Sequence, residues 1–164
     1  MNRLKTNSSQ ETAAFRPGHL QLGKRGEELA AAYLQQLGYR LVAANFTVPV
    51  GRNSIGTLLN LEIDLVAYEG PTLCFVEVKT RTSDRFAAPS ANVDIRKQRQ
   101  ITRASRSYRR MLGVLEQPYR YDVVSIVMPA ADEHPTKLQI DVLRNFWTEE
   151  KFRKRRWTEE YWDQ

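Results

Sequence analysis

The chain has 164 residues, of which 41% are hydrophobic and 27% charged, values that suit one globular domain with a sizeable core. Its net charge of +6 and its isoelectric point near 9.6 favour an anionic partner, either nucleic acid or a membrane surface. No apolar run is long enough to span a membrane, and the N-terminus lacks the apolar segment of a secretory signal. The single cysteine, Cys74, has no partner for an intramolecular disulfide. We therefore expect a cytoplasmic protein without a membrane partner.

The first predicted helix follows a polar N-terminal arm. Residues 1–19 carry few large apolar side chains, whereas apolar residues recur at helical spacing over 20–37 and Gly38 is placed to end the helix. Glu27 lies at the edge of the apolar stripe of this helix, and Glu28 points away from it. Two acids near a helix N-terminus are also typical of a solvated helix end that the dipole favours.

The middle of the chain predicts strands. A short strand is expected at 39–46, followed by a loop at 47–60 that contains one proline and two glycines. Two apolar runs rich in β-formers, 61–68 and 73–78, flank a Gly-Pro pair and predict a hairpin. After a polar connection and a helix at 93–112, further strands are expected at 121–128 and 138–143. A strand–helix–strand sequence indicates a right-handed crossover between parallel strands.

The second predicted helix is strongly basic. Residues 94–110 hold seven Lys or Arg and one Asp, so their net charge of +6 equals that of the whole chain. An arginine stripe is usually a solvated helix face, but five arginines in one sector with almost no compensating acid favour phosphate contacts. The residues expected to contact nucleic acid are Arg81, Arg96, Lys97, Arg99, Arg103, Arg106 and Arg110.

Three charged side chains interrupt the predicted hairpin. Asp64 lies within the first apolar run, and Glu77 and Lys79 end the second. Because alternate residues of a strand share a face, Glu77 and Lys79 project to one side, and Asp64 approaches from the neighbouring strand. Two carboxylates beside an ammonium are a familiar arrangement for phosphodiester hydrolysis with Mg²⁺ or Mn²⁺. A cross-strand salt bridge would explain the same residues, and spacing alone favours that interpretation.

Asp64, followed after a hairpin by Glu77-Val78-Lys79, resembles the core of the PD-(D/E)xK nucleases, although Ile63 stands at the position of their proline. Several ordered segments between residues 23 and 146 more closely resemble the bacterial YraN-like family of uncharacterised proteins, which is similar to archaeal Holliday junction resolvases. These segments are GKRGEELAAAYLQQLGYR, EIDLVAYEG, FVEVKTR, RYDVVSI and IDVLRNF. The 47–60 loop is longer than is usual in this family.

The resemblance implies an α/β fold with a restriction-endonuclease-like core, a central mixed sheet of four to five strands flanked by helices in the order α-β-β-β-α-β. It implies that Mg²⁺ or Mn²⁺ is held by the side chains of Asp64, Glu77 and Glu27 and by the Val78 carbonyl. It also implies that Lys79 is the catalytic lysine. Lys97 lies nearer the apolar face of its helix than the arginine stripe does, so it could reach the site or only flank the helix start.

We expect three segments: a flexible arm at 1–19, a nuclease-like domain at 20–146, and a Trp-rich charged extension at 147–164. The predicted function is nucleic-acid binding and metal-dependent endonuclease activity on structured or branched DNA, with DNA favoured over RNA. A homodimer is plausible by analogy with resolvases. Two alternatives stay open, namely a catalytically silent nucleic-acid-binding protein of the same fold and a structural interaction module that uses the C-terminal extension.

Overall fold

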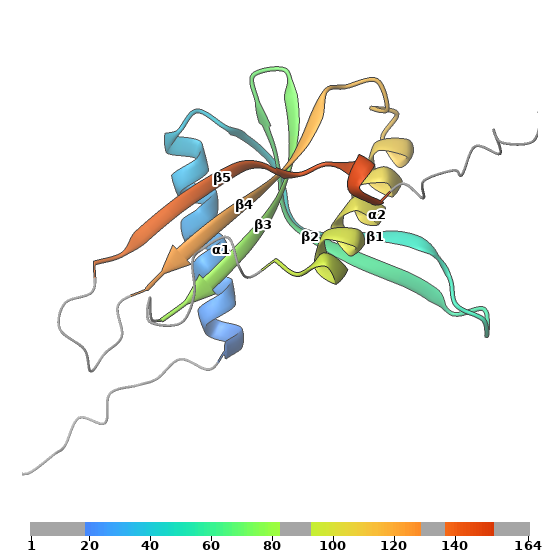
Figure 1. The fold of residues 1–164 in the computed structure, drawn as a ribbon, viewed down its shortest axis with the longest axis horizontal. Coiled ribbons are helices and arrows are strands. Elements are labelled where there is room, and N and C mark those ends of the chain that lie inside the picture. Colours follow the sequence, from blue (N-terminus) through green and yellow to red (C-terminus); the bar gives the residue numbers. More distant parts are fainter. Residues whose placement is uncertain (1–18, 83–92, 129–136, 153–164) are drawn as a thin grey trace, which may run out of the picture.

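A computed structural model describes residues 19–82, 93–128 and 137–152. The predicted arm, except its last residue, and most of the predicted extension lie outside these ranges. Within these ranges, two helices, five strands and a short 3₁₀ helix follow one another, the helices and strands in the order α-β-β-β-α-β-β (Figure 1), which confirms the predicted α/β restriction-endonuclease-like core. The elements are α1 (His19–Gln36), β1 (Arg40–Arg52), β2 (Leu58–Glu69), β3 (Thr72–Arg81), α2 (Ile95–Met111), β4 (Tyr119–Val127), β5 (Gln139–Trp147) and η2 (Glu149–Phe152).

The five strands form one mixed sheet in the order β1-β2-β3-β4-β5. Neighbouring strands are antiparallel except for β3 and β4, which are parallel and are joined through α2, as the strand–helix–strand pattern predicts. Every residue of β4 from Tyr121 onward is buried, which is typical of a strand covered on both faces. Neither helix within the described ranges is long and apolar enough to cross a membrane.

The two faces of the sheet carry separate cores, one under each helix (Figure 1). Leu73 and Phe75 of β3 pack on the face covered by α2. Cys74 and Val76 alternate with them and pack on the face covered by α1. The predicted strand parity is therefore correct, and it carries the side chain of Glu77 to the α2 face at the C-terminal end of β3.

The prediction of a loop at 47–60 is wrong, because β1 and β2 continue through these residues as a hairpin. Pro49 is compatible with this arrangement since β1 is an edge strand, where a missing N–H need not break a ladder. The register shifts between Pro49 and Gly51, and the positive φ of Gly51, 129°, fits a bulge. The turn is closed by Asn53, whose Oδ1 accepts the Thr57 N–H at 2.8 Å.

The first residues of the expected extension pack against the domain. Trp147 is buried at the end of β5, and its ring stacks on Tyr121 with centroids 4.8 Å apart. The indole N–H donates to the Thr102 hydroxyl of α2 at 3.0 Å. These contacts join β5 to α2 over the sheet.

Candidate functional site

The candidate site begins where β2 separates from β3. Their antiparallel pairing ends at Leu65 and Val76. Just beyond this pair, Asp64 Oδ2 accepts the Val78 N–H at 2.8 Å, so a side chain replaces a backbone ladder bond. Because the N–H and C=O of a strand residue point toward the same neighbouring strand, the Val78 carbonyl is directed to the side on which Asp64 lies.

Glu77 is the centre of a charged cluster at this place. Its side chain is only 1% exposed, and its Oε1 lies 2.7 Å from Lys79 Nζ. Its Oε2 lies 3.0 Å from Lys97 Nζ, an ion pair whose geometry falls short of a hydrogen bond. The same Lys97 ammonium is 3.8 Å from Asp64 Oδ1. Two carboxylates and two ammonium groups thus meet at one end of the sheet.

The protonation of the cluster is strongly perturbed. Burial raises the pKa of Asp64 to about 7, and the negative charge of Glu77 adds to this effect. The Lys97 ammonium and the hydrogen bond from Val78 N–H act in the opposite direction and offset only part of it. Burial tends to lower the pKa of Lys97, but the two carboxylates prevail and raise it. Lys97 therefore offsets only part of the effect that burial and Glu77 have on Asp64.

Lys97 reaches the cluster because the start of α2 is held in place. Asp94 is the N-cap of the helix, and its side chain accepts the Lys97 N–H at 2.8 Å. In the same turn the buried amide of Gln98 donates to the Val93 carbonyl and accepts from Lys151. The sequence predicted Lys97 as a nucleic-acid contact that could also reach the site, and the packing of α2 on the sheet brings it into ion pairs with both carboxylates.

Glu27 lies on α1, which covers the other face of the sheet, and its side chain is half-buried. The preceding residue, Gly26, packs so closely on β3 that a Cβ at this position would be 1.8 Å from Thr80 Oγ1. Within the described ranges, no three His, Cys, Asp or Glu side chains are grouped to hold a metal, so Glu27 is not gathered with Asp64 and Glu77. Its role as a ligand stays a prediction.

The arginines of α2 lie on an exposed face, as their spacing predicts. We call Arg96, Arg99, Arg103, Arg106 and Arg110 the basic face; all five are exposed. Arg103 donates to the Val50 carbonyl at 2.7 Å. The Arg99 guanidinium lies 5.7 Å from the centre of the Phe152 ring. Arg81, at the end of β3, is half-buried.

One acid missed at the sequence level neutralises part of the basic face. Glu149 of η2 forms an ion pair with Arg106 at 2.7 Å, and it accepts a hydrogen bond from Tyr121 at 2.8 Å. These contacts hold the pKa of Glu149 below its usual value despite burial. Glu149 is 43 residues from Arg106, and no local pattern connects the two.

A second polar cluster lies away from the candidate site. Asp122 of β4 is fully buried, and it accepts hydrogen bonds from Arg120 Nε and from the Asn145 N–H. Arg120 also donates to Tyr39 and Glu69. This network joins β4 to β5, to the end of β2 and to the start of β1, so its role is structural.

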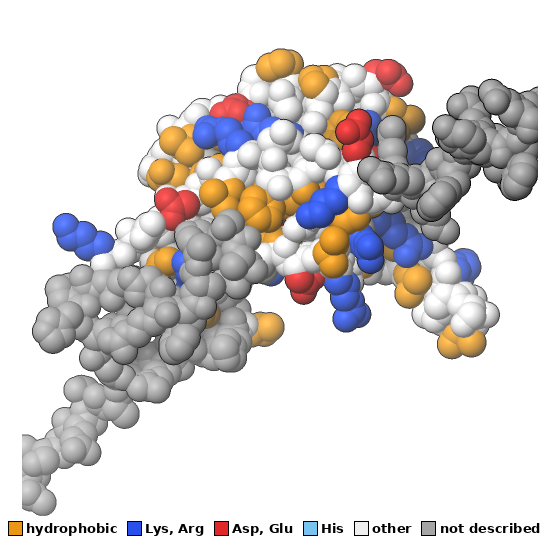
Figure 2. Space-filling view, viewed as in Figure 1, with side chains coloured by type: hydrophobic (Ala, Val, Ile, Leu, Met, Phe, Trp, Pro, Cys, Tyr) orange, Lys and Arg blue, Asp and Glu red, His pale blue; other side chains and the backbone are white. Residues whose placement is uncertain are grey.

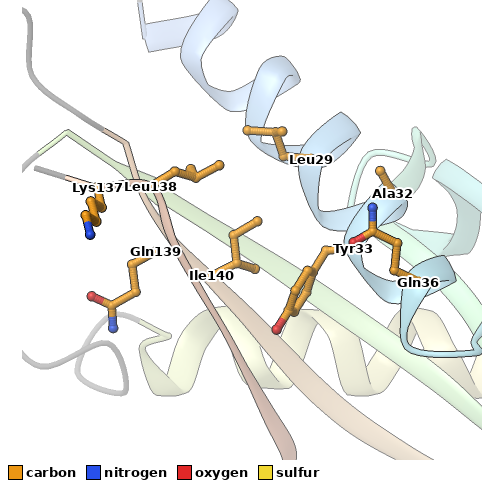
Figure 3. A pocket seen from close by; sticks show the side chains of 8 residues that line it. All are labelled: Leu29, Ala32, Tyr33, Gln36, Lys137, Leu138, Gln139 and Ile140. Carbon is orange, nitrogen blue, oxygen red and sulfur yellow. The ribbon is translucent and has the colours of Figure 1, made fainter.

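An open groove of about 850 Å³ lies between α1 and β5, on the face of the sheet opposite to Glu77 (Figure 3). Leu29, Tyr33 and Gln36 line one side, and residues 137–140 line the other. The groove contains none of the predicted site residues.

The fold and the cluster together define the class: an α/β protein with a restriction-endonuclease-like core, carrying two carboxylates and two lysines where strands β2 and β3 separate. Comparison of the sequence with known families agrees with this class. The sequence model of the uncharacterised protein family UPF0102 matches residues 26–126, and the chain belongs to this YraN-like family. The matched range includes Asp64, Glu77, Lys79 and Lys97, and it ends before β5.

Curated relatives carry the same family name. The chain is 41% identical over 111 residues to a UPF0102 protein of Geobacter sulfurreducens, covering 68% of this chain and 79% of the relative. It is 38% identical over 112 residues to one of Koribacter versatilis, covering 68% and 72%. A relative from Chlorobium chlorochromatii is 37% identical over 132 residues, covering 79% and 94%. Neither the family description nor these names states an activity.

Proposed function

We propose that this protein is a metal-dependent endonuclease that hydrolyses phosphodiester bonds in structured or branched DNA. The observation that carries the proposal is the pair of buried carboxylates, Asp64 and Glu77, which a single ammonium contacts at 3.8 and 3.0 Å. The pair lies next to the start of the helix that carries the basic face. Similarity to resolvases favours DNA over RNA and suggests a homodimer.

The donor set fits Mg²⁺ or Mn²⁺. Carboxylate oxygens, a backbone carbonyl and water are the ligands that these ions prefer, and Mg²⁺ usually keeps several waters. Asp64, Glu77 and the Val78 carbonyl would hold the ion. The buried Glu77 Oε2 lacks a hydrogen bond, and burial and the charge of Glu77 raise the pKa of Asp64, an effect that a bound cation would counteract. When bound, such an ion activates water and offsets negative charge on the phosphate.

The two lysines supply the remaining functions. Lys79 is partly exposed, and its contact with Glu77 orients its ammonium toward the cluster, where it can position the attacking water or bind a phosphate oxygen. Lys97 is also partly exposed, so it can bind the phosphate from the α2 side. The basic face would hold the neighbouring phosphates through sequence-independent contacts.

The test is a cleavage assay with supercoiled, single-stranded and four-way-junction DNA, and with RNA, in Mg²⁺, Mn²⁺ or EDTA. Glu77→Gln and Lys79→Met are expected to abolish metal-dependent cleavage while leaving junction binding within threefold of wild type. Glu28→Gln is the matched control for Glu27→Gln, because both acids lie on α1 but only Glu27 is a predicted ligand. Cleavage that persists in both the Glu77 and the Lys79 variants contradicts the proposed site.

One observation favours a second candidate, a nucleic-acid-binding protein that does not turn over. Lys97 already contacts both carboxylates, so the chain supplies a cation of its own at the cluster. This candidate predicts that neither Mg²⁺ nor Mn²⁺ binds at millimolar concentration in calorimetry. It also predicts that salt-dependent nucleic-acid binding survives the Glu77→Gln substitution and the addition of EDTA.

A further inference from the structure

The hairpin of β1 and β2 continues past the core as a protruding arm, which we define as residues 51–60 (Figure 1). Every residue of this arm is exposed. Three of them are aliphatic: Ile55 at the turn is 83% exposed, Leu58 is 48% exposed and Leu59 is 36% exposed. Aliphatic side chains concentrated on a projecting tip mark an interaction surface more often than scattered ones do.

The base of the arm is held by α2, although a two-stranded hairpin alone is marginally stable in water. Two side chains of α2 hold its base: Arg103 donates to the Val50 carbonyl at 2.7 Å, and Ser107 donates to the Pro49 carbonyl at 2.5 Å. At the tip, Arg52 donates to the Gly56 carbonyl at 2.6 Å across the turn. The arm and the basic helix therefore form one unit.

The positive charge of the arm and the basic face favours an anionic partner. The arm contains Arg52 and no acid, and the exposed arginines of the basic face lie on the helix that supports it. Figure 2 shows Lys and Arg side chains gathered over α2 and the base of the hairpin. An apolar tip next to a basic surface is complementary to nucleic acid, whose charged backbone encloses apolar stacked bases.

We propose that the arm is a wedge that inserts Ile55 and Leu58 between stacked bases of the DNA bound at the candidate site. The proposal rests on the proposed function for the identity of the polymer. Apolar side chains such as Leu and Ile, inserted from the minor groove, unstack base steps and kink the duplex in this way. Leu58 and Asp64 lie on the same strand, six residues or about 20 Å apart at the rise of a strand. This length equals the rise of about six base pairs, so the unstacked step lies within about that distance of the bond that is cut.

A second copy of this chain is the competing occupant of the tip. A stable protein interface buries about 800 Å² on each partner, and three partly exposed aliphatic side chains supply only a fraction of that area. The absence of acids along residues 51–60 also disfavours pairing of two arms, because the two Arg52 side chains would repel each other.

The experiment compares wild type with Ile55→Ser/Leu58→Ser in EDTA, where binding is measured without cleavage. The probe is a four-way junction with 2-aminopurine placed at successive steps, together with a linear duplex of the same length. We expect wild type to increase the fluorescence at a step near the junction, and the double variant to abolish this increase. The dissociation constant for the junction is expected to rise at least tenfold, and that for the duplex less than threefold.

Leu115→Ser is the matched control, because Leu115 is also aliphatic and 48% exposed but lies outside the arm. Ile55→Ser alone provides a variant at the most exposed position, so a folding defect of the double variant does not obscure the result. Unchanged fluorescence and affinity in both arm variants overturn the wedge. So does a wild-type dimer that the arm variants dissociate while junction binding stays intact.

The wedge and the nuclease fail in different ways. Loss of unstacking in wild type, with metal-dependent cleavage present, overturns only the wedge. If wild type unstacks the bases but cleaves no DNA with any metal ion, the proposed nuclease activity is overturned and the proposed wedge is supported. Failure of wild type to bind any DNA overturns both.

Discussion

Replacing Asp64 with asparagine is expected to stabilise the metal-free protein at alkaline pH. The folded protein holds Asp64 with a pKa of about 7, raised from 3.8 by burial and by Glu77. An acid whose pKa is raised on folding costs stability once the pH exceeds its unfolded pKa, and the full cost is present above the folded pKa. The amide of asparagine carries no charge, and its oxygen can still accept the Val78 N–H that Asp64 Oδ2 accepts at 2.8 Å.

The magnitude follows from the size of the pKa shift. A shift from 3.8 to about 7 corresponds to about 4 kcal/mol at 1.36 kcal/mol for each pH unit. This is the expected gain for Asp64→Asn at pH 8, and it falls below about 1 kcal/mol near pH 4. For a chain of this size, about 4 kcal/mol raises the melting temperature by roughly 10 °C.

The assay is thermal unfolding in EDTA between pH 4 and pH 8. Glu62→Gln is the control, because Glu62 lies on the same strand two residues away but its side chain is exposed. We expect the control to stay within about 0.5 kcal/mol of wild type at every pH. A variant at Asp64 that is less stable than wild type at pH 8 refutes the reasoning. That result would mean that Asp64 serves mainly as a salt-bridge partner of Lys97.

Three further predictions follow from other contacts. A proton on Asp64 competes with a metal ion, so the affinity for Mn²⁺ measured by calorimetry should increase up to tenfold for each unit by which the pH is raised toward 7, and should be constant above pH 7. An affinity that does not change between pH 5 and pH 8 argues against Asp64 as a ligand. Gly26→Ala should lower the free energy of unfolding by about 1–3 kcal/mol, since its Cβ would meet Thr80 Oγ1 at 1.8 Å. In the same helix, a Cβ at Gly23 would meet nothing within 4 Å, so Gly23→Ala should be neutral or stabilising by up to about 1 kcal/mol. If Gly26→Ala and Gly23→Ala change the free energy of unfolding equally in denaturant titrations, the close packing of α1 on β3 is contradicted. Arg106→Gln should lower the free energy of unfolding by about 0.5–1 kcal/mol in the same titrations, because the Arg106 side chain is half exposed and Glu149 keeps Arg109 and Tyr121 as partners. Arg110→Gln should leave stability unchanged and reduce the slope of the salt dependence of DNA binding by about one. A stability loss confined to Arg110→Gln would contradict both expectations.

The candidate site is an arrangement that costs the fold stability. Glu77 is almost fully buried with two ammonium partners, and Asp64 is buried beside it. Buried ion pairs seldom stabilise a fold relative to apolar residues of similar size. Groups that cost stability where two strands separate are typical of functional sites, which the proposed metal site would explain.

The sequence by itself determined the features that depend on near neighbours along the chain. The period of two in residues 73–79 correctly placed Glu77 and Lys79 on one face, because successive strand residues alternate between faces. The period of the second helix likewise separated the arginines of the basic face from the apolar side that packs on the sheet. Asp64 was also recognisable from its near neighbours, because it is a charged residue within an apolar run.

Only the tertiary structure decided which of these residues meet. Three features depend on how the helices pack: the contact of Lys97 with both carboxylates, the pairing of Glu149 with Arg106, and the position of Glu27 on the opposite face. The hairpin at 47–60 was predicted as a loop because Pro49 and Gly51 disfavour strands in general. They are tolerated here because β1 is an edge strand with a bulge, supported by α2. Local spacing reports which face a side chain takes, but contacts between distant segments are set by the packing of whole elements.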